Sequence, residues 1–269
     1  SLSLRERAGV RAPQSSRTML FVSYGTWREE VVGDIAVFRP GEALDGLLVA
    51  FSGRGVAPAE EPSPTSFLAR RFARALSLDA KPIVRATQVH GNRAASVRES
   101  PPPGAVLDAG ECDVLATDLS GVALAVQTAD CVPILLASEE AIATVHAGWR
   151  GTAQNAAGAA VRALAELGAA PSSLRAWLGP SIGSCCYEVG SEVAAQFAGE
   201  FLRASCGGRF RLDVAAVNRA QLEAAGVPPT GISVHPACTK CGGEKYASYR
   251  RDGAAAGRMI GLVMRLGWG

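Results

Sequence analysis

Residues 128–151 read TADCVPILLASEEAIATVHAGWRG, with two short apolar runs on either side of a polar connection. This pattern is typical of a β-hairpin. If the turn centres on Ser138 and Glu139, Cys131 and His146 stand directly opposite each other. Directly opposed residues of an antiparallel pair have Cβ atoms about 4.5–5.5 Å apart. The hairpin therefore predicts a thiol and an imidazole within reach of one metal ion, or of each other.

Two interpretations of this pair stay open on the residues alone. In the first, the two side chains bind a metal ion or act together in catalysis. In the second, they are a buried thiol beside a hydrogen-bonded histidine with no functional role, because free cysteine is among the residues most often buried. Asp130, which precedes Cys131, is similarly open. It either orients a metal-binding histidine or is a carboxylate at the start of a strand that bonds to backbone.

The chain contains three histidines, and two of them end strand-like runs. His90 follows the run 83–89, and His146 ends the second half of the hairpin; each opens into a turn that contains glycine. Strand ends and loops are where functional sites are usually built. Two histidines and one cysteine leave a tetrahedral zinc ion with one open position, as in catalytic zinc sites. We therefore predict His90, Cys131 and His146 as metal ligands, provided that His90 reaches the hairpin.

Strand-like and helix-like runs are mixed over the rest of the chain, without a regular βαβ order. The predicted helices include residues 153–167 after Thr152, a helix to Ala225 that Asp213 caps, and a final helix over 254–266. This mixture predicts one α/β (α+β) domain with mixed β-sheets flanked by helices. We expect the domain to span residues 19–269, after a tail of residues 1–18.

The composition narrows the classes of partner and compartment. Hydrophobic residues make up 48% of the chain, enough for a real core, and the net charge of +2 predicts no strongly charged surface for nucleic acid or membrane. No run approaches the roughly 20 apolar residues of a membrane span. Seven cysteines do not suit a complete set of disulfides. We therefore expect a reducing, cytoplasmic setting, and a monomer or homodimer.

A second group of potential ligands lies late in the chain. His235, Cys238 and Cys241 have the spacing of metal ligands, and Cys185 and Cys186 could add to them. A structural zinc site would require four of these residues to converge. Adjacent cysteines do not easily bind one ion in tetrahedral geometry, which argues against such a site.

The chain resembles the YfiH-like family, also called the laccase-domain or polyphenol oxidase family, over roughly residues 80–265. The resemblance is carried in the same order by QVHG (88–91), QTADCVPIL (127–135), HAGWRG (146–151), LGPSIGSCCYEVG (178–190) and SYRRDG (248–253). It implies one α/β domain and a zinc ion held by His90, Cys131 and His146. It also implies a multifunctional purine nucleoside phosphorylase, which cleaves adenosine, inosine, guanosine or methylthioadenosine with phosphate and deaminates adenosine.

Zn²⁺ would activate phosphate or water in such an enzyme, and Cu²⁺ could substitute because it binds these ligand types more tightly. Cys131 and His146 are thus candidates for catalysis as well as ligands. We expect Arg54, Arg150 or Arg250 to hold the anionic co-substrate. Gln88 or Asp130 would bond the nucleoside or move a proton.

The N-terminal third departs from the family pattern. FSGRGVA (51–57) is the nearest equivalent of a family segment with an arginine and two glycines, and a second family segment is missing. Arg54 would keep the substrate-facing role of the first segment. The missing segment bears on the range of substrates.

Three other functions stay open. A copper phenol oxidase is disfavoured because a multicopper site requires more than three histidines. A cysteine hydrolase would use Cys131 as nucleophile and His146 as base. A binding module with structural zinc is disfavoured by the open fourth position, since structural zinc usually has four protein ligands.

Overall fold

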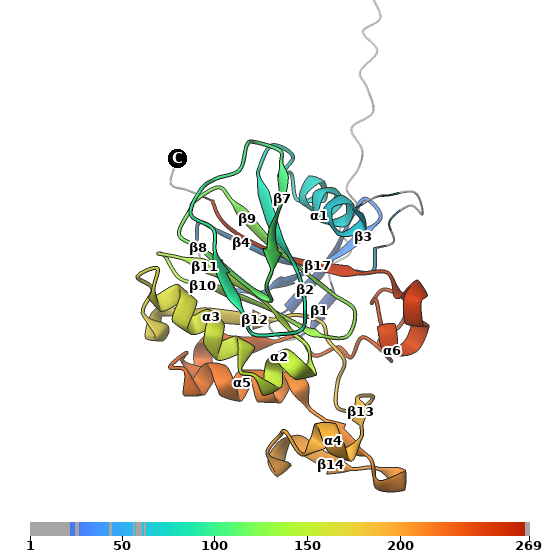
Figure 1. Ribbon diagram of the computed structural model, residues 1–269. Helices are drawn as coiled ribbons and strands as arrows, with labels where there is room; N and C mark the ends of the chain where they lie inside the picture. Colours follow the sequence, from blue (N-terminus) through green and yellow to red (C-terminus); the bar gives the residue numbers. More distant parts are fainter. Residues whose placement is uncertain are drawn as a thin grey trace, which may run out of the picture.

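Two large β-sheets pack face to face, with helices on their outer faces (Figure 1). The structure, a computed structural model, describes residues 22–24, 27–42, 45–55, 57, 61 and 63–266. The predicted tail of residues 1–18 lies outside these. The layers confirm the predicted fold class of mixed sheets flanked by helices.

The larger sheet has eight strands and is mostly antiparallel; only β5 pairs in parallel, with both of its neighbours. Its order is β1 (Val22–Tyr24), β2 (Trp27–Val32), β3 (Ile35–Pro40), β4 (Leu47–Ser52), β17 (Met259–Arg265), β9 (Ala123–Thr128), β5 (Ile83–Thr87) and β7 (Val106–Glu111).

The smaller of the two has six strands and is mixed. Its order is β16 (Ile232–Val234), β12 (Arg175–Leu178), β10 (Val132–Ala137), β11 (Ile142–Ala147), β8 (Val114–Thr117) and β6 (Ala94–Ser96). A third sheet holds β13 (Glu188–Val189), β15 (Phe210–Leu212) and β14 (Leu202–Ala204), and lies with α4 (Ser191–Ala194) at the lower end of Figure 1.

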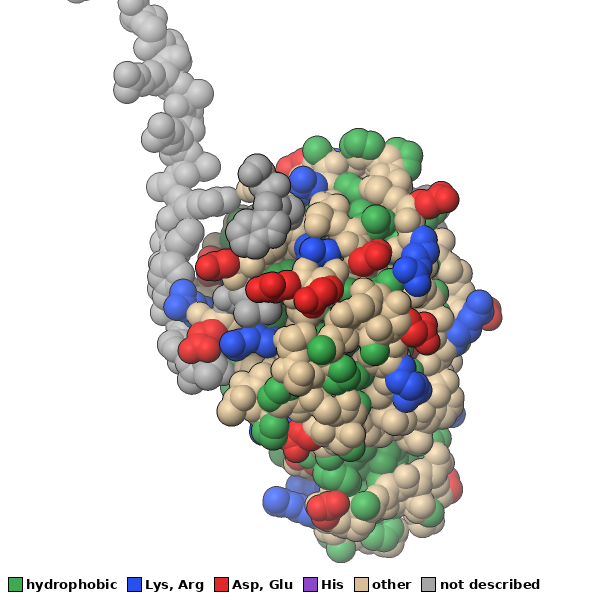
Figure 2. Space-filling model, turned by 90° about the vertical axis from the view of Figure 1, so that its left-hand side faces the viewer, with side chains coloured by type: hydrophobic (Ala, Val, Ile, Leu, Met, Phe, Trp, Pro, Cys, Tyr) green, Lys and Arg blue, Asp and Glu red, His purple; other side chains and the backbone are tan. Residues whose placement is uncertain are grey.

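Three longer helices cover the outer faces of the large sheets. α1 (Pro64–Ala75) packs Leu68 and Phe72 on the larger sheet, whereas α3 (Ala156–Ala165) and α5 (Val214–Ala224) pack on the smaller one. The remaining helices are short: α2 (Trp149–Ala153), α6 (Tyr249–Asp252), η1 (Pro171–Ser173), η2 (Gly199–Phe201), η3 (Cys206–Gly208), η4 (Pro229–Gly231) and η5 (Gly253–Ala256). Within the described ranges, no helix has both the length and the apolar character that crossing a bilayer requires. On the face drawn in Figure 2, acidic and basic side chains are interspersed.

The chain crosses from the larger to the smaller sheet three times in succession. The crossings join β5 to β6, β7 to β8, and β9 to β10. Because β5 runs parallel to both β7 and β9, the C-terminal ends of these three strands lie side by side, and the three crossings begin there. His90, Asp113 and Cys131 lie in these three connections.

The predicted hairpin is confirmed, but its predicted register is wrong. His146 pairs with Pro133 rather than with Cys131, which precedes the paired residues. The turn centres one residue later than expected, because the Ser138 hydroxyl oxygen accepts the N–H groups of Glu140 and Ala141. Such local side-chain bonds fix turn position independently of the apolar pattern.

The predicted final helix over 254–266 is also wrong. β17 occupies most of this range and pairs with β4 on one side and β9 on the other. Its residues are buried on both faces, so the alternation that marks a half-buried strand is absent.

Of the two predicted interior helices, one is confirmed and one is divided. The Asp213 side chain accepts the N–H of Ala216 at the start of α5, as expected. The run 153–167 is interrupted at Asn155, which has a left-handed backbone (φ 59°) and caps α3. Thr152 therefore lies inside α2 instead of capping a helix.

Candidate functional site

His90, Cys131 and His146 converge, each from a different segment of the chain. One potential ligand atom from each lies within 4.8 Å of the other two. The two imidazole rings have centroids 4.7 Å apart and are inclined at 78°. The structure thus brings together the three predicted ligands, although the register prediction behind two of them is wrong.

The connection that carries His90 is held by a carboxylate that the sequence analysis missed. Asp113 accepts the backbone N–H groups of Gly91 (2.7 Å), His90 (3.0 Å) and Val89 (3.2 Å). These bonds stabilise a backbone in which His90 has φ 64°, a left-handed conformation that is uncommon for residues other than glycine. The position of Asp113, directly before the apolar run 114–117, was the only signal in the sequence.

Asp113 also orients His146. Its Oδ1 lies 2.8 Å from His146 Nδ1, and both side chains are buried. Nδ1 is thereby engaged, which leaves Nε2 to face the cluster. Burial lowers the pKa of His146, but bonds to Asp113 and Cys131 outweigh that effect and raise the pKa to about 9.

The Cys131 thiol is set to ionise near neutral pH. Burial raises its pKa, yet hydrogen bonds and the positive charge of His146 and His90 lower the pKa to about 6. The thiolate is both the nucleophilic and the metal-binding form of cysteine.

Glycines at two positions allow α2 to approach the ligands. A Cβ atom at Gly148 would lie 3.0 Å from both Cys131 Sγ and His90 Cδ2. A Cβ at Gly151 would lie 2.6 Å from the carbonyl oxygen of Gly91. The spacing of glycines in HAGWRG (146–151) is therefore required by close packing of α2 on the connection that carries His90.

The cluster opens into a cavity of about 560 Å³. Of the other predicted site residues, Gln88, Asp130, Arg150 and Arg250 line this cavity, and Arg54 does not. The remaining lining residues are His90, Gln127, Thr128, Ala129, Cys131, His146, Gly148, Trp149, Ile182, Tyr187, Tyr249 and Arg258.

The side chains of Gln88 and Asp130 form hydrogen bonds with neighbouring protein groups. The Gln88 amide donates to the carbonyl of Gln127 (2.8 Å) and accepts its N–H (2.9 Å). Asp130 accepts the Thr239 hydroxyl and the backbone N–H of Arg250, both at 2.6 Å. Of the two interpretations of Asp130, the carboxylate bonded to backbone fits the structure.

Three arginines bring positive charge to the cavity. Arg250 stacks over the Tyr187 ring at 5.2 Å, and Arg150 over the Trp149 ring at 4.5 Å. Arg258 was not predicted, because it lies in the range 254–266 that was expected to form a final helix. Arg54 instead donates to the carbonyl of Ala255 and lies 3.8 Å from Asp252, outside the cavity lining.

Aromatic side chains form another part of the wall and were not predicted. Tyr187 and Tyr249 both line the cavity, and Tyr249 is 60% exposed. Their only sequence signal is that they stand within SCCYEVG (184–190) and SYRRDG (248–253). Apolar flat surfaces beside cationic groups suit a ligand with an aromatic ring and an anionic part.

The amino-acid sequence is similar to those of known proteins. A purine nucleoside phosphorylase of Deinococcus radiodurans is 41% identical over 218 residues, which cover 77% of this chain and 81% of that protein. Adenosine deaminase RL5, from an unknown prokaryotic organism, is 37% identical over 210 residues, or 72% of this chain and 79% of the relative.

The fold has a counterpart among solved structures as well. The Bacillus licheniformis hypothetical protein YfiH superimposes with a TM-score of 0.77 at 27% identity, over 90% of this chain and 99% of that one. Residues 59–266 match the model of a family described as multi-copper polyphenol oxidoreductase laccase. The chain therefore belongs to this YfiH-like, laccase-domain family.

Proposed function

We propose that the protein is a zinc-dependent purine nucleoside phosphorylase that also deaminates adenosine. The observation that carries the proposal is the convergence of His90, Cys131 and His146 at a cavity of about 560 Å³ lined by cationic and aromatic side chains. The names of the two relatives, a purine nucleoside phosphorylase and an adenosine deaminase, support it.

The three side chains fit a catalytic zinc site. Imidazole nitrogen and thiolate sulfur are ordinary zinc ligands, and three protein ligands leave one position for a substrate or water. Asp113 on His146 supplies the carboxylate–histidine arrangement that commonly fixes a zinc ligand. A zinc ion bound here would supply Lewis-acid chemistry toward a phosphate, a water molecule or a substrate oxygen.

The walls of the cavity divide by chemistry. Arg150, Arg250 and Arg258 would bind phosphate through charge-assisted hydrogen bonds. Tyr187 and Tyr249 would pack against the purine ring. The volume of about 560 Å³ falls within the range of about 300–1,000 Å³ that small-molecule sites occupy.

Release of the free base tests the proposal. Zinc-loaded protein would be incubated with adenosine, inosine and methylthioadenosine, with and without phosphate. We expect phosphate-dependent release that Cys131→Ala abolishes and that Cys206→Ala retains, because Cys206 is exposed and lies outside the cavity lining. Absence of release from every nucleoside would contradict the proposal, and ammonia release from adenosine tests deamination separately.

A copper oxidase finds less support, whatever the description of the family model. The chain has three histidines in all. His235 is buried against the rings of Trp27 and Phe38, so only His90 and His146 could serve a copper site at the cavity. A trinuclear copper cluster requires several more imidazoles.

A cysteine hydrolase is favoured by one specific observation. Cys131 hydrogen-bonds to His146, and His146 hydrogen-bonds to Asp113. This is the arrangement of a nucleophile, a base and a carboxylate that orients the base. This function predicts that metal-free protein is active and that Cys131 carries a covalent adduct during turnover. Loss of activity on removal of zinc would argue for the phosphorylase instead.

A further inference from the structure

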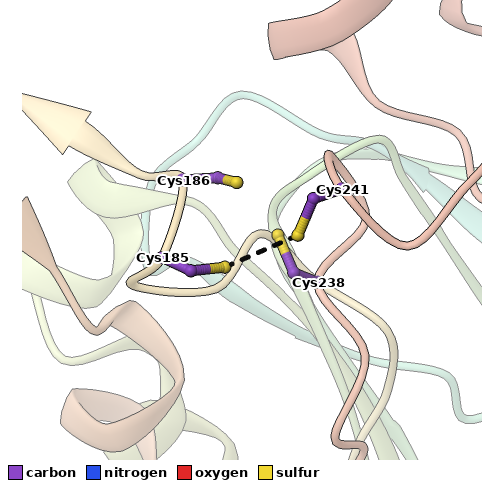
Figure 3. A group of neighbouring side chains, drawn as sticks. All are labelled: Cys185, Cys186, Cys238 and Cys241. Atoms are coloured by element: carbon purple, nitrogen blue, oxygen red, sulfur yellow. Dashed lines mark hydrogen bonds between the residues drawn. The ribbon is translucent and has the colours of Figure 1, made fainter.

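A second cluster of metal-binding side chains lies outside the cavity lining. The sulfur atoms of four cysteines all lie within 4.8 Å of one another: Cys185, Cys186, Cys238 and Cys241 (Figure 3). The adjacency of Cys185 and Cys186 in the sequence had argued against this convergence, and that expectation is wrong. His235 takes no part, since it packs among aromatic rings and its Nδ1 accepts the N–H of Ala237.

A turn removes the difficulty of the adjacent cysteines. Adjacent side chains of an extended strand point to opposite faces. Here the N–H groups of Cys186 (2.9 Å) and Tyr187 (3.0 Å) both donate to the carbonyl of Gly183, which curls residues 183–187. Cys185 and Cys186 consequently both present their sulfurs to Cys238 and Cys241, as Figure 3 shows.

The separation of the Cys185 and Cys241 sulfurs matches that expected in a four-coordinate zinc site. A Zn–S bond of about 2.3 Å in a tetrahedron places the sulfurs about 3.8 Å apart. The Sγ atoms of Cys185 and Cys241 are 3.7 Å apart. A disulfide would require a separation of about 2.05 Å. The remaining pairs, all within 4.8 Å, would reach the tetrahedral separation through small side-chain rotations.

Backbone donors surround the most buried sulfur. The backbone N–H groups of Cys241, Gly183 and Lys240 all hydrogen-bond to the Cys238 sulfur. N–H groups aimed at a cysteine sulfur stabilise the thiolate, which is the form that binds metal.

We propose that Cys185, Cys186, Cys238 and Cys241 bind one zinc ion in a closed, structural site. Four thiolates fill a tetrahedral coordination sphere and leave no position for substrate. The site is separate from the cluster at Cys131 and does not depend on the proposed phosphorylase activity.

The site would join two segments that shape the cavity. Residues 183–187 end in Tyr187, whereas the segment from Cys238 onward carries Thr239, which bonds to Asp130, and then Arg250. Apart from an ion, a parallel bridge between Ser181 and Cys238 and the stacking of Arg250 on the Tyr187 ring link these segments. A shared ion would hold the Tyr187 and Arg250 walls at a fixed separation.

Zinc content of the full chain, purified without an affinity tag, tests the proposal. We expect two zinc ions per chain in the wild type, one in Cys185→Ser/Cys241→Ser, and one in Cys131→Ala. Cys206→Ser should retain both, because it removes an exposed cysteine outside both clusters. A single zinc ion in the wild type that disappears in Cys131→Ala would overturn the four-cysteine site.

Native mass spectrometry of the wild type keeps the test decisive if the double variant does not fold. The wild type should carry two zinc ions and Cys131→Ala one, with the four cysteines shielded from iodoacetamide until a chelator is added. Iron in place of zinc, or a loss of hydrogens that indicates disulfides without metal, would refute the assignment. Hydrogen exchange should then quicken on metal removal in residues 181–190 and 238–252, but not in α3.

Discussion

At the scale of single residues, Asp113 links the two histidines of the candidate site. One carboxylate accepts three backbone N–H groups beside His90 and also contacts His146 Nδ1. Hydrogen bonds from His146 and from the backbone outweigh the effect of burial and hold the pKa of Asp113 below its usual value. The residue thereby determines both the shape of one connection and the tautomer of His146.

Asp113→Asn should weaken zinc binding by about 10- to 100-fold, the usual effect of losing a carboxylate partner of a metal-binding histidine. The amide keeps only one acceptor oxygen, so His146 or the His90 connection loses its partner. Competition with a chromophoric chelator measures the affinity. Asp118→Asn is the matched control, because Asp118 is exposed. Equal affinity in the two variants would contradict the role of Asp113.

His235 predicts a dependence of stability on pH. Burial and the charge of Lys245 lower its pKa from 6.5 to about 4. Between these values the unfolded chain binds more protons than the folded one. The stability that neutral His235 supports is thus complete above about pH 6.5 and is lost as pH falls toward 4.

His235→Phe should remove this dependence while keeping an aromatic ring beside Trp27 and Phe38. Below pH 6.5 the wild type should lose up to about 1.4 kcal/mol of unfolding free energy per pH unit more than the variant. Urea denaturation at several pH values measures both proteins. Parallel pH profiles would show that His235 does not titrate in this way.

At the scale of elements, the site depends on where connections meet. His90, Asp113 and Cys131 come from three successive crossings between the sheets, and His146 from a strand of the smaller sheet. α2 then packs against the first crossing, where Gly151 lies under the carbonyl of Gly91.

Gly151→Ala should therefore disturb His90, which lies next to that contact. Its Cβ would lie 2.6 Å from a backbone oxygen, so α2 or the His90 connection has to move. We expect a loss of about 1–3 kcal/mol in unfolding free energy and weaker zinc binding. Urea denaturation and metal titration report the two effects. Gly199→Ala, with no atom within 4 Å of its Cβ, should change neither.

The sequence could predict which residues are candidates for a site more reliably than which of them lie close together in the fold. His90, Cys131 and His146 were identifiable because imidazole and thiol are few and chemically distinctive. The hairpin was identifiable from its apolar runs, but its register follows from side-chain bonds of Ser138. The convergence of the cysteines at 185–186 and 238–241 depends on a turn and on a non-local bridge, neither of which the spacing reveals.

At the scale of the whole molecule, four layers share three apolar clusters, and the central cluster lies between the sheets. The fold class was predictable because helical and extended runs alternate irregularly. The position of β17 was not, since a strand buried on both faces carries no alternation. Arg258, which precedes β17 and lines the cavity, was missed for the same reason.

Leu135→Ala tests the central layer. Leu135 is fully buried between the two sheets, so its truncation leaves a cavity and should cost about 2–5 kcal/mol of unfolding free energy. Leu107→Ala, at a leucine that is 48% exposed, should change it by less than about 0.5 kcal/mol. The urea midpoints of both variants measure the difference, and similar midpoints would mean that the sheets repack freely.

The three crossings also couple the site mechanically to the sandwich. His90 and Cys131 are tethered to strands of both sheets, and His146 belongs to the smaller one. An ion bound by all three side chains would cross-link the two sheets. Sliding of the sheets would then require its release, so occupancy would raise the melting temperature by mass action. A change that shifts one sheet relative to the other would in turn lower the metal affinity, because it would separate the three side chains.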